Sequence, residues 1–429
     1  MNHSDSERIA AYLEKNNLSE TSNINEANFV VFNTCGVRQM AEDRVYGQIH
    51  NLHKDKKSKR KIILTGCLAN RKDVQKRLKD KVDLFFPINE FEKLENFVIG
   101  NLLEIGNLKL KISAQKISHI QESIAYLSIN PKYTNNFQAF VPIMTGCNNF
   151  CAYCVVPYAR GREVSRPHKE IIKEIKALVK KGYQEITLLG QNVNSYNDGK
   201  INFSQLLKKV DAIPGNFRIL FVSNHPKDVD DEMIEAVTSC KKVCECFHLP
   251  LQAGSDEVLR RMNRKYNSKD YLKIVNKIKK AFKKNKPGKL FSITSDIIVG
   301  FPGETKKQFE ESAKVMRKAE YDMVYFGQFS PRPGTAAWNM KNNVSKTEKA
   351  RREKYLNEIL KKTTSENNKN YVGKTLEVLI EKEENGFYFG KTRTLKNVKI
   401  PAAKKRLVGK ILNVKIIKAN AWNLEGKLN

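Results

Sequence analysis

Three cysteines at 146–154 form the motif with the clearest chemical meaning in this sequence. The segment reads GCNNFCAYC, so Cys147, Cys151 and Cys154 have the spacing C-x3-C-x2-C directly after a stretch that predicts a β-strand. Three thiolates on one short loop can each bind one iron of a [4Fe–4S] cluster, which leaves the fourth iron open to another ligand. The motif therefore predicts a cluster with an open coordination site, where chemistry can take place.

Two other interpretations of these cysteines remain. A structural zinc site normally has four protein ligands, and the closest candidate for a fourth, His168, lies beyond a proline-containing loop. Chance placement of three core cysteines is the other alternative. For a second group, Cys240, Cys244 and Cys246, we prefer the core interpretation, because alternation along a predicted strand places Cys244 and Cys246 on one side, as for small buried residues.

The composition excludes several classes of protein. The chain has 429 residues, of which 40% are hydrophobic and 29% charged, so it is neither embedded in a membrane nor wholly disordered. At about 100–200 residues per domain, two to four domains are expected. Residues 1–20 lack the basic and apolar regions of a signal peptide. We expect a cytoplasmic protein, in which the eight cysteines are core thiols, nucleophiles or metal ligands rather than disulfides.

The chain is strongly basic. It carries 77 Lys plus Arg against 46 Asp plus Glu, a formal net charge of +31. A polyanion such as nucleic acid is the leading partner, and lysines spread over solvated surfaces are the alternative. The segment from Tyr371 onward is the most basic per residue, and we expect Lys404, Lys405 and Arg406 to contact phosphates there.

Hydrophobic periodicity divides the chain into three parts. Short apolar runs at 29–33, 61–67 and 82–88 alternate with amphipathic stretches and predict a parallel α/β sheet. The middle part repeats a strand followed by a helix six times, which is too few for an eight-stranded barrel and predicts an open, partial barrel. Its predicted strands lie at 138–146, 185–190, 217–223, 243–251, 293–300 and 322–329. From Tyr371, short alternating runs broken by glycines predict a small β-barrel.

The cysteine motif at the end of the first barrel strand resembles the radical S-adenosylmethionine superfamily. More narrowly, the chain resembles the methylthiotransferases through PIMTGCNNFCAYCVVPYARGREVSRP, LLGQNVNSY, SNHPKD, HLPLQAGSDEVLRRMNRKY, SDIIVGFPGET and FSPRPGTAA. The resemblance implies an N-terminal methylthiotransferase domain (1–120), a radical S-adenosylmethionine (β/α)6 partial barrel (133–365) and a C-terminal TRAM-type RNA-binding barrel (366–429). LLGQNVNSY and SNHP are most similar to the branch that acts on N6-dimethylallyladenosine in tRNA.

The resemblance implies two [4Fe–4S] clusters. Cys147, Cys151 and Cys154 would hold the one that binds and cleaves S-adenosylmethionine. The second, auxiliary cluster normally has three cysteine ligands, of which Cys35 and Cys67 are present here. Because the opening MNHSDSE is similar to an internal stretch of the family, the first cysteine and the first strand of the sheet are expected upstream of Met1. We interpret this as a start codon assigned too late; a true truncation would impair sulfur insertion.

Five further residues are expected to contact S-adenosylmethionine. By resemblance, Gln191 and Asn192 bind its methionine amino group, with a surface turn as the alternative. Asp296 lies in an apolar strand and Gln252 follows HLPL, so each makes either a structural hydrogen bond or a ribose or substrate contact. Tyr153 packs near the adenine or in the core. Outside this set, arginines 160, 162 and 166 hold a carboxylate or RNA phosphate, or lie on the solvated surface, and His225 is a turn or capping residue.

The resemblance implies the reaction. One S-adenosylmethionine methylates a sulfur at the auxiliary cluster, and another yields a radical that removes hydrogen from carbon 2 of the adenine. The expected partners are the tRNA anticodon stem-loop, an electron donor and a sulfur source, with the protein a monomer. Two alternatives are a methylthiotransferase for threonylcarbamoyladenosine tRNA or a ribosomal protein, and a catalytically impaired tRNA-binding protein.

Overall fold

The computed structural model describes residues 1–36, 39–54, 60–104, 122–402 and 406–428. The chain forms two units. The first comprises residues 1–134, 144–166 and 330–338, and the second comprises residues 135–143, 167–329 and 339–429. The cysteine loop at 146–154 therefore belongs to the same unit as the N-terminal segment. The domain boundaries expected from the sequence stay a prediction.

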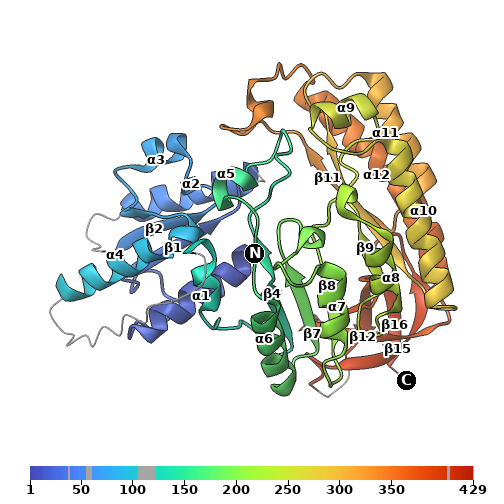
Figure 1. Ribbon diagram of the computed structural model, residues 1–429, viewed down its shortest axis with the longest axis horizontal. Helices are drawn as coiled ribbons and strands as arrows, with labels where there is room; N and C mark the ends of the chain where they lie inside the picture. The colour runs from blue at the N-terminus through green and yellow to red at the C-terminus, as the bar shows by residue number, and fades with distance from the viewer. Residues whose placement is uncertain (37–38, 55–59, 105–121, 403–405, 429) are drawn as a thin grey trace. The chain divides into compact units, whose positions relative to one another are not determined.

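The first unit is built on a parallel sheet of three strands (Figure 1). The strands are β1 (Phe29–Thr34), β2 (Lys61–Gly66) and β3 (Leu84–Phe85), with β2 in the centre. They coincide with the three predicted apolar runs, so the parallel α/β prediction is confirmed here. Ile63 and Leu64 of β2 are fully buried, as expected for the central strand of a parallel sheet.

Helices and short segments complete the first unit. The helices are α1 (Asn2–Lys15), α2 (Gln39–Lys54), α3 (Lys72–Leu78), α4 (Phe91–Glu104) and α5 (Val156–Arg160), with the 3-10 helices η1 (Ile88–Glu90) and η2 (Glu122–Ser128). The short strands β5 (Met144–Thr145) and β6 (Val164–Ser165) pair antiparallel around the cysteine loop. The 3-10 helix η5 (Ala336–Asn339) ends the segment at 330–338.

The second unit contains six parallel strands in chain order. Two three-stranded sheets, β4-β7-β8 and β9-β10-β11, are linked by a bridge between Ile219 and Val243. The strands are β4 (Gln138–Pro142), β7 (Glu185–Leu189), β8 (Arg218–Phe221), β9 (Cys246–His248), β10 (Ser292–Val299) and β11 (Met323–Gln328). Six strand–helix repeats are what the sequence predicts, and the partial-barrel interpretation is confirmed.

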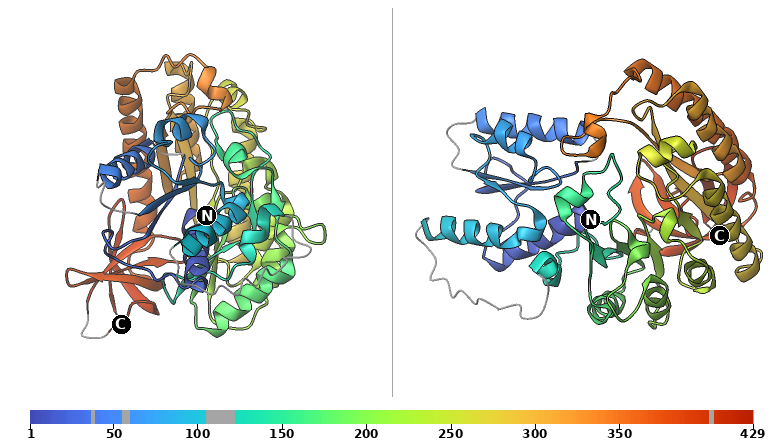
Figure 2. Two further views of the ribbon diagram at one scale, coloured as in Figure 1. Left: turned by 90° about the vertical axis from the view of Figure 1, so that its left-hand side faces the viewer. Right: turned by 45° about the horizontal axis from the view of Figure 1, so that its top comes forward.

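The helices of this unit lie along one side of the strands (Figures 1 and 2). Helix α6 shows why: Ile171, Ile175 and Leu178 fall on one stripe and are buried, while the lysines between them face solvent. The others are α7 (Phe203–Asp211), α8 (Asp231–Ser239), α9 (Asp256–Arg261), α10 (Ser268–Asn285), α11 (Lys306–Ala319) and α12 (Lys346–Lys369), after α6 (His168–Lys180). Two 3-10 helices, η3 (Val193–Ser195) and η4 (Pro226–Asp228), follow strand ends.

The C-terminal residues of the second unit form a closed barrel. Its strands are β12 (Thr375–Glu384), β13 (Phe387–Thr392), β14 (Asn397–Pro401), β15 (Ile411–Ala419) and β16 (Leu424–Leu428), in the order β12-β13-β14-β16-β15. The small β-barrel prediction is confirmed. Strand β16 has only a weak sequence signal, because LEGKL is short and has a glycine at its centre. Lys404 and Lys405 lie outside the described residues.

The loop between β13 and β14 contacts residues at the starts of β9, β10 and β11. Arg393 donates to both carboxylate oxygens of Glu245 at 2.8 and 3.0 Å. Lys396 forms an ion pair with Asp322 at 2.9 Å. Ser292 Oγ donates to the Thr394 carbonyl at 2.8 Å. These contacts fix the C-terminal barrel to the amino-terminal edge of the sheet β9-β10-β11.

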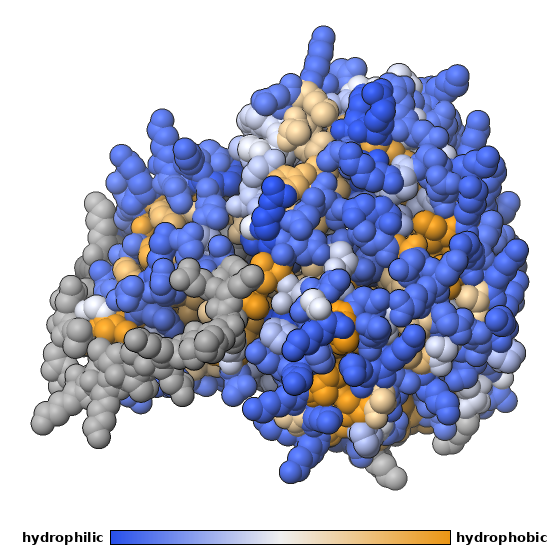
Figure 3. Space-filling model, in the orientation of Figure 1, coloured by the Kyte–Doolittle hydropathy of each residue, from blue (hydrophilic) through white to orange (hydrophobic). Residues whose placement is uncertain are grey.

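The surface is predominantly hydrophilic in the view of Figure 3, in keeping with the low apolar content. Within the part of the chain that the structure describes, no helix combines the length and apolar character needed to cross a membrane.

Candidate active site

The cysteine loop connects β5 to α5 in the first unit. The Cys154 amide donates to the Cys151 carbonyl at 2.9 Å, which closes a tight turn between these two cysteines. The Ala337 amide donates to the Ala152 carbonyl at 2.8 Å. Residues almost two hundred positions later in the sequence thus hold the loop, and sequence spacing alone cannot reveal this contact.

Burial gives the thiols of this loop an unusual electrostatic environment. Burial, with smaller contributions from the neighbouring Cys151 and Cys147, raises the pKa of Cys154 to about 12. Burial also raises the pKa of Cys147, although Asn149 Nδ2, 3.5 Å from its sulfur, opposes the shift. Thiolates at these positions need a compensating positive charge. Iron supplies that charge, so the donor set fits an iron–sulfur cluster.

No group of three His, Cys, Asp or Glu side chains among the described residues is arranged around one metal ion. A single ion requires all its ligands to converge on one point, whereas each cysteine of a [4Fe–4S] site binds a different iron. Ligation of a cluster by Cys147, Cys151 and Cys154 stays a prediction.

Gly146 fixes the start of the loop. Its φ is +78°, and a Cβ there would lie 2.0 Å from the Arg162 carbonyl oxygen. We expect Gly146→Ala to displace the loop and to lower both the iron bound after anaerobic reconstitution and the thermal midpoint. Gly161→Ala is the matched control, because its φ is +76° but a Cβ there meets nothing within 4 Å. Because its ψ is −164°, Gly161→Ala should cost about 1–3 kcal/mol of stability through backbone strain, but it should keep iron binding. Equal iron loss in both variants would contradict this account.

Cys35 and Cys67 lie next to each other at the ends of two paired strands. Strands β1 and β2 run in register up to Thr34 and Gly66, and each is followed directly by a cysteine. A Cβ on Gly36 would lie only 2.9 Å from the Cys67 Cβ. The structure thus brings together the two cysteines assigned to an auxiliary cluster. Their role as ligands, and a third cysteine upstream, stay predictions.

Cys67 also packs against the helix that follows the cysteine loop. It forms a small buried cluster with Val155 and Ala159 of α5. A cavity of about 410 Å³ opens beside it, lined by Cys67, Asn70, Arg71, Lys72, Asp73, Val155, Tyr158, Ala159, Pro333 and Gly334. All five assigned cysteines and this cavity belong to one unit.

A buried ion network anchors the segment at 330–338. Glu42 accepts hydrogen bonds from Arg71 at 2.8 Å, Arg332 at 3.1 Å and the Tyr46 hydroxyl at 2.8 Å. Arg332 also donates to Gln39 at 2.7 Å. In the sequence Arg332 was only part of FSPRPGTAA, because its partners lie about 290 positions earlier.

The three arginines after the cysteine loop have different roles. Arg160 is buried and pairs with Asp5 at 2.5 Å, with side-chain exposures of 3% and 1%. This confirms a carboxylate partner and excludes phosphate binding by Arg160 in this structure. Arg166 is also buried. Arg162 is exposed and its guanidinium lies 4.5 Å from the centre of the Phe150 ring; its contact with RNA stays a prediction.

Gln191 and Asn192 follow β7 in the second unit and present unused acceptors. Asn192 Nδ2 donates to Asp228 Oδ2 at 2.8 Å, which orients its amide. The Gln191 Oε1 and Asn192 Oδ1 atoms are buried and have no hydrogen-bond donor within the described ranges. Buried acceptors without a partner are costly. An ammonium group would satisfy them, so these residues fit the methionine end of S-adenosylmethionine.

Gln252 and Asp296 meet at a backbone bridge between the end of β9 and β10. The Gln252 amide donates to the Asp296 carbonyl at 2.8 Å, and Gln252 has a φ of +70°. A non-glycine residue at positive φ is held there by its surroundings, often at a functional site. Tyr153 lies in the first unit, on the cysteine loop. Cofactor contacts of all three stay predictions.

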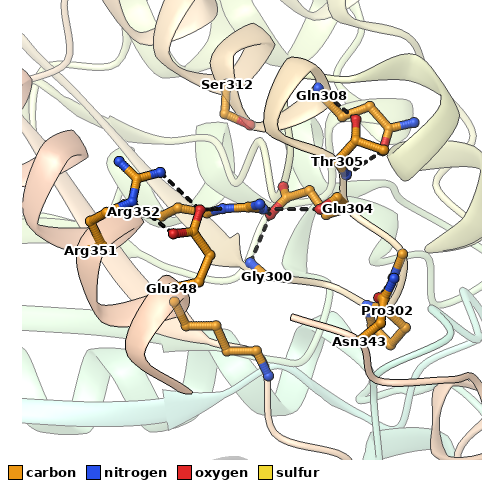
Figure 4. A network of polar contacts seen from close by, with 12 residues as sticks. Gly300, Pro302, Glu304, Thr305, Gln308, Ser312, Asn343, Glu348, Arg351 and Arg352 are labelled. Atoms are coloured by element: carbon orange, nitrogen blue, oxygen red, sulfur yellow. Dashed lines mark hydrogen bonds and ion pairs between the residues drawn. The ribbon is translucent and has the colours of Figure 1, made fainter. Parts of the chain in front are cut away.

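The turn after β10 shows what holds this strand end. Glu304 Oε2 accepts from the Gly300 amide at 2.8 Å and from Arg352 of α12 at 2.9 Å (Figure 4). Arg352 also donates to Glu348 at 2.7 Å. The carboxylate of Glu304 ties the turn to α12, a structural role consistent with the absence of a phosphate-loop motif.

Two further expectations concern residues outside the site. Cys240, Cys244 and Cys246 are buried, and burial raises the pKa of Cys244 to about 12 and that of Cys246 to about 11. Their assignment as core thiols is confirmed. His225 caps η4, its Nδ1 accepting from the Lys227 amide at 3.2 Å. Burial lowers its pKa to about 2, and the capping prediction is confirmed.

Comparison with known proteins identifies the three parts of the chain. Residues 141–316 match the Radical SAM superfamily, residues 1–87 the uncharacterized protein family UPF0004, and residues 369–428 the TRAM domain. Among solved structures, the radical S-adenosylmethionine methyltransferase TsrM from Kitasatospora setae aligns with a TM-score of 0.50 at 12% identity. That alignment covers 77% of this chain and 66%, slightly under two thirds, of TsrM. This likeness shows the fold alone.

Curated relatives match the whole chain. Proteins named tRNA-2-methylthio-N(6)-dimethylallyladenosine synthase from Clostridium botulinum (strain Okra) and Clostridium novyi are 41% identical, covering 100% of this chain and 94% of each relative. One of the same name from Thermoanaerobacter pseudethanolicus is 40% identical, covering 100% and 90%. The chain belongs to the radical S-adenosylmethionine methylthiotransferase family and, within it, to the group of these synthases.

Proposed function

We propose that this protein attaches a methylthio group to carbon 2 of N6-dimethylallyladenosine next to the anticodon of tRNA. The observation that carries the proposal is the placement of two separate cysteine groups in one unit, in a chain 41% identical over its full length to synthases of that name. One group lies on a loop and the other at two strand ends. Two sulfur-ligated centres suit a reaction that needs both a radical source and a sulfur source.

Cys147, Cys151 and Cys154 would hold the cluster that binds S-adenosylmethionine, and Cys35 and Cys67 would hold the auxiliary cluster. When bound, the first cluster supplies an electron to the sulfonium of S-adenosylmethionine and the auxiliary one holds the sulfur to be transferred. Cys67, Val155 and Ala159 form a buried apolar contact between the two cysteine groups, which would lower the dielectric constant around them.

Gln191 and Asn192 would bind the methionine ammonium through their unpaired acceptors. We expect Asn192→Leu to raise the KM for S-adenosylmethionine about 10-fold or more, because a hydrogen bond to a charged group is lost. Iron content should not change, since no cysteine contact involves Asn192. A KM equal to that of the parent protein would contradict this role.

The C-terminal barrel would bind the RNA backbone. On its outer side Lys415 of β15 pairs with Lys427 of β16, and both side chains are exposed. Trp422, in the turn between these strands, is exposed as well. Lysines attract phosphates and an exposed indole can stack on an unpaired base, so this surface fits an anticodon loop better than a protein.

The test is an anaerobic assay with nucleoside mass analysis. The reconstituted full chain is incubated with S-adenosylmethionine, a reductant and tRNA that carries dimethylallyladenosine. The expected product is that nucleoside with hydrogen replaced by a methylthio group. Addition of a methylthio group to threonylcarbamoyladenosine or to a ribosomal protein instead would contradict the proposed substrate. Binding of tRNA without cleavage of S-adenosylmethionine would indicate a catalytically impaired tRNA-binding protein.

A further inference from the structure

Helix α10 lies on the outer side of the second unit (Figure 1) and carries lysines on its solvent side. Its buried residues fall on one stripe, formed by Tyr271, Val275, Ile278 and Phe282. At 3.6 residues per turn, the opposite side carries the exposed lysines at positions 269, 273, 277, 280, 283 and 284. Apart from Asn276, every exposed residue of the helix is a lysine. Lys289, in the loop that follows the helix, is exposed as well.

The lysines of α10 differ in whether an acidic group neutralises them. In the first half of the helix, Lys273 pairs with Asp270 at 2.9 Å and Lys277 with Asp231 at 2.7 Å. Toward the C-terminal end, no carboxylate among the residues that the structure describes lies within ion-pair distance of Lys280, Lys283, Lys284 or Lys289. The helix dipole contributes only about half a negative charge at this end. The C-terminal end of α10 therefore presents a concentrated positive charge to the solvent.

This end of α10 adjoins the C-terminal barrel. Leu290 packs against the apolar core of the barrel. Lys286 Nζ donates to Glu245 at 2.9 Å, and the same carboxylate accepts from Arg393 of the barrel at 2.8 Å. The barrel is itself the most basic part of the chain per residue. The exposed lysines at the end of α10 thus extend a basic surface that begins on the barrel.

The chemistry of the α10 surface favours a phosphate backbone as its partner. Lysine is depleted in protein–protein interfaces, and a helix that lies on a membrane needs exposed apolar side chains. The exposed side of α10 has neither an apolar residue nor an aromatic ring on which an unpaired base could stack. Phosphates along an RNA double helix need only positive charges at their level. The surface therefore suits duplex RNA better than a protein, a membrane or an unpaired loop.

The position of this surface favours a part of the tRNA away from the target base. Lys286 contacts Glu245 directly before β9, at the amino-terminal end of the strands, whereas Gln191 and Asn192 follow the carboxyl end of β7. Strand β10 has eight residues, so the two ends of the strands are about 25 Å apart at about 3.3 Å per residue. RNA that reaches both ends must extend well beyond the loop that carries the target base.

We propose that Lys280, Lys283, Lys284 and Lys289 bind phosphates of the double-helical body of the tRNA, outside the anticodon stem-loop. The inference rests on the proposed function and adds a second contact surface for the same substrate. Contacts to phosphates position the RNA and carry no sequence information. The lysines should therefore act equally on tRNA with and without the dimethylallyl group.

The first test removes the charge from the end of the helix. Lys280→Gln, Lys283→Gln and Lys284→Gln are combined in the full chain, and binding of full-length tRNA is measured from 50 to 200 mM salt. We expect about 10-fold or more weaker binding at the low-salt end, and a slope of log K against log salt that is shallower by about two to three. The affinity for an isolated anticodon stem-loop should not change. Arginine at the same three positions keeps the charge and should keep the affinity.

The matched control removes the same charge from another outer helix. Lys173→Gln, Lys176→Gln and Lys180→Gln lie on α6, where all three lysines are exposed, and this variant should bind full-length tRNA like the parent protein. Equal losses in the two triple variants would make the effect one of net charge and overturn the proposal. An unchanged affinity of the α10 variant, or an equal loss for the isolated stem-loop, would also overturn it. If the parent protein forms no methylthio nucleoside, the proposed function fails, whereas the binding comparison still tests the surface.

Discussion

Replacing Cys151 by alanine is expected to abolish S-adenosylmethionine cleavage. Cys151 sits in the turn closed by the Cys154 amide, so its loss leaves two thiols on a loop that needs three to hold a cluster. The iron and sulfide bound after anaerobic reconstitution should fall by about half if two clusters are present in the parent protein, and 5′-deoxyadenosine should fall to background. Both quantities are measured on the same sample.

Cys244→Ala is the control for this prediction. It removes the same side chain from a buried position in the second unit, where no cluster is expected. It should cost about 1 kcal/mol of stability through lost packing and retain iron and cleavage. A Cys67→Ala variant adds a second contrast, because it should keep cleavage and lose sulfur transfer. If Cys151→Ala cleaved S-adenosylmethionine at the parent rate, Cys151 would not be a ligand of the cluster.

The sequence was sufficient to predict the fold and the site wherever local patterns decide the structure. The runs at 29–33 and 61–67 became parallel strands because they are continuously apolar, and the C-x3-C-x2-C spacing places three thiols on one loop in any fold. Cys35 and Cys67 could be paired only through the resemblance. Their proximity arises from the register of β1 with β2, which no local pattern specifies.

Contacts between distant segments were not predictable in the same way. Arg332 lies in a glycine- and proline-rich stretch, and nothing near it indicates that Glu42 is its partner. For Arg160 the sequence left two partners open, because a basic residue beside a cluster motif can bind either a phosphate or a carboxylate. The structure shows that its partner is the buried carboxylate of Asp5.

The second large effect is expected at Glu245, where the C-terminal barrel is fixed to the sheet β9-β10-β11. This buried carboxylate accepts two hydrogen bonds from Arg393 and one from Lys286 at 2.9 Å. Glu245→Gln leaves the buried Lys286 and the partly buried Arg393 without this counter-charge, which should destabilise the fold by about 3–5 kcal/mol. Lys286→Met should cost less, because it leaves the pair of Glu245 with Arg393 intact. Thermal midpoints of the two variants measure the difference.

The pH dependence provides an independent check on the same contact. Burial raises the pKa of Glu245, but Arg393 and Lys286 outweigh it, so the pKa lies below its ordinary value of 4.5. A carboxyl whose pKa is lower in the folded state stabilises the protein above its unfolded pKa and loses that contribution as pH falls through the folded pKa. The parent protein should therefore lose stability more steeply than Glu245→Gln below about pH 4.5. Parallel acid profiles, or equal midpoints for Glu245→Gln and Lys286→Met, would show that this ion network does not fix the barrel to the sheet.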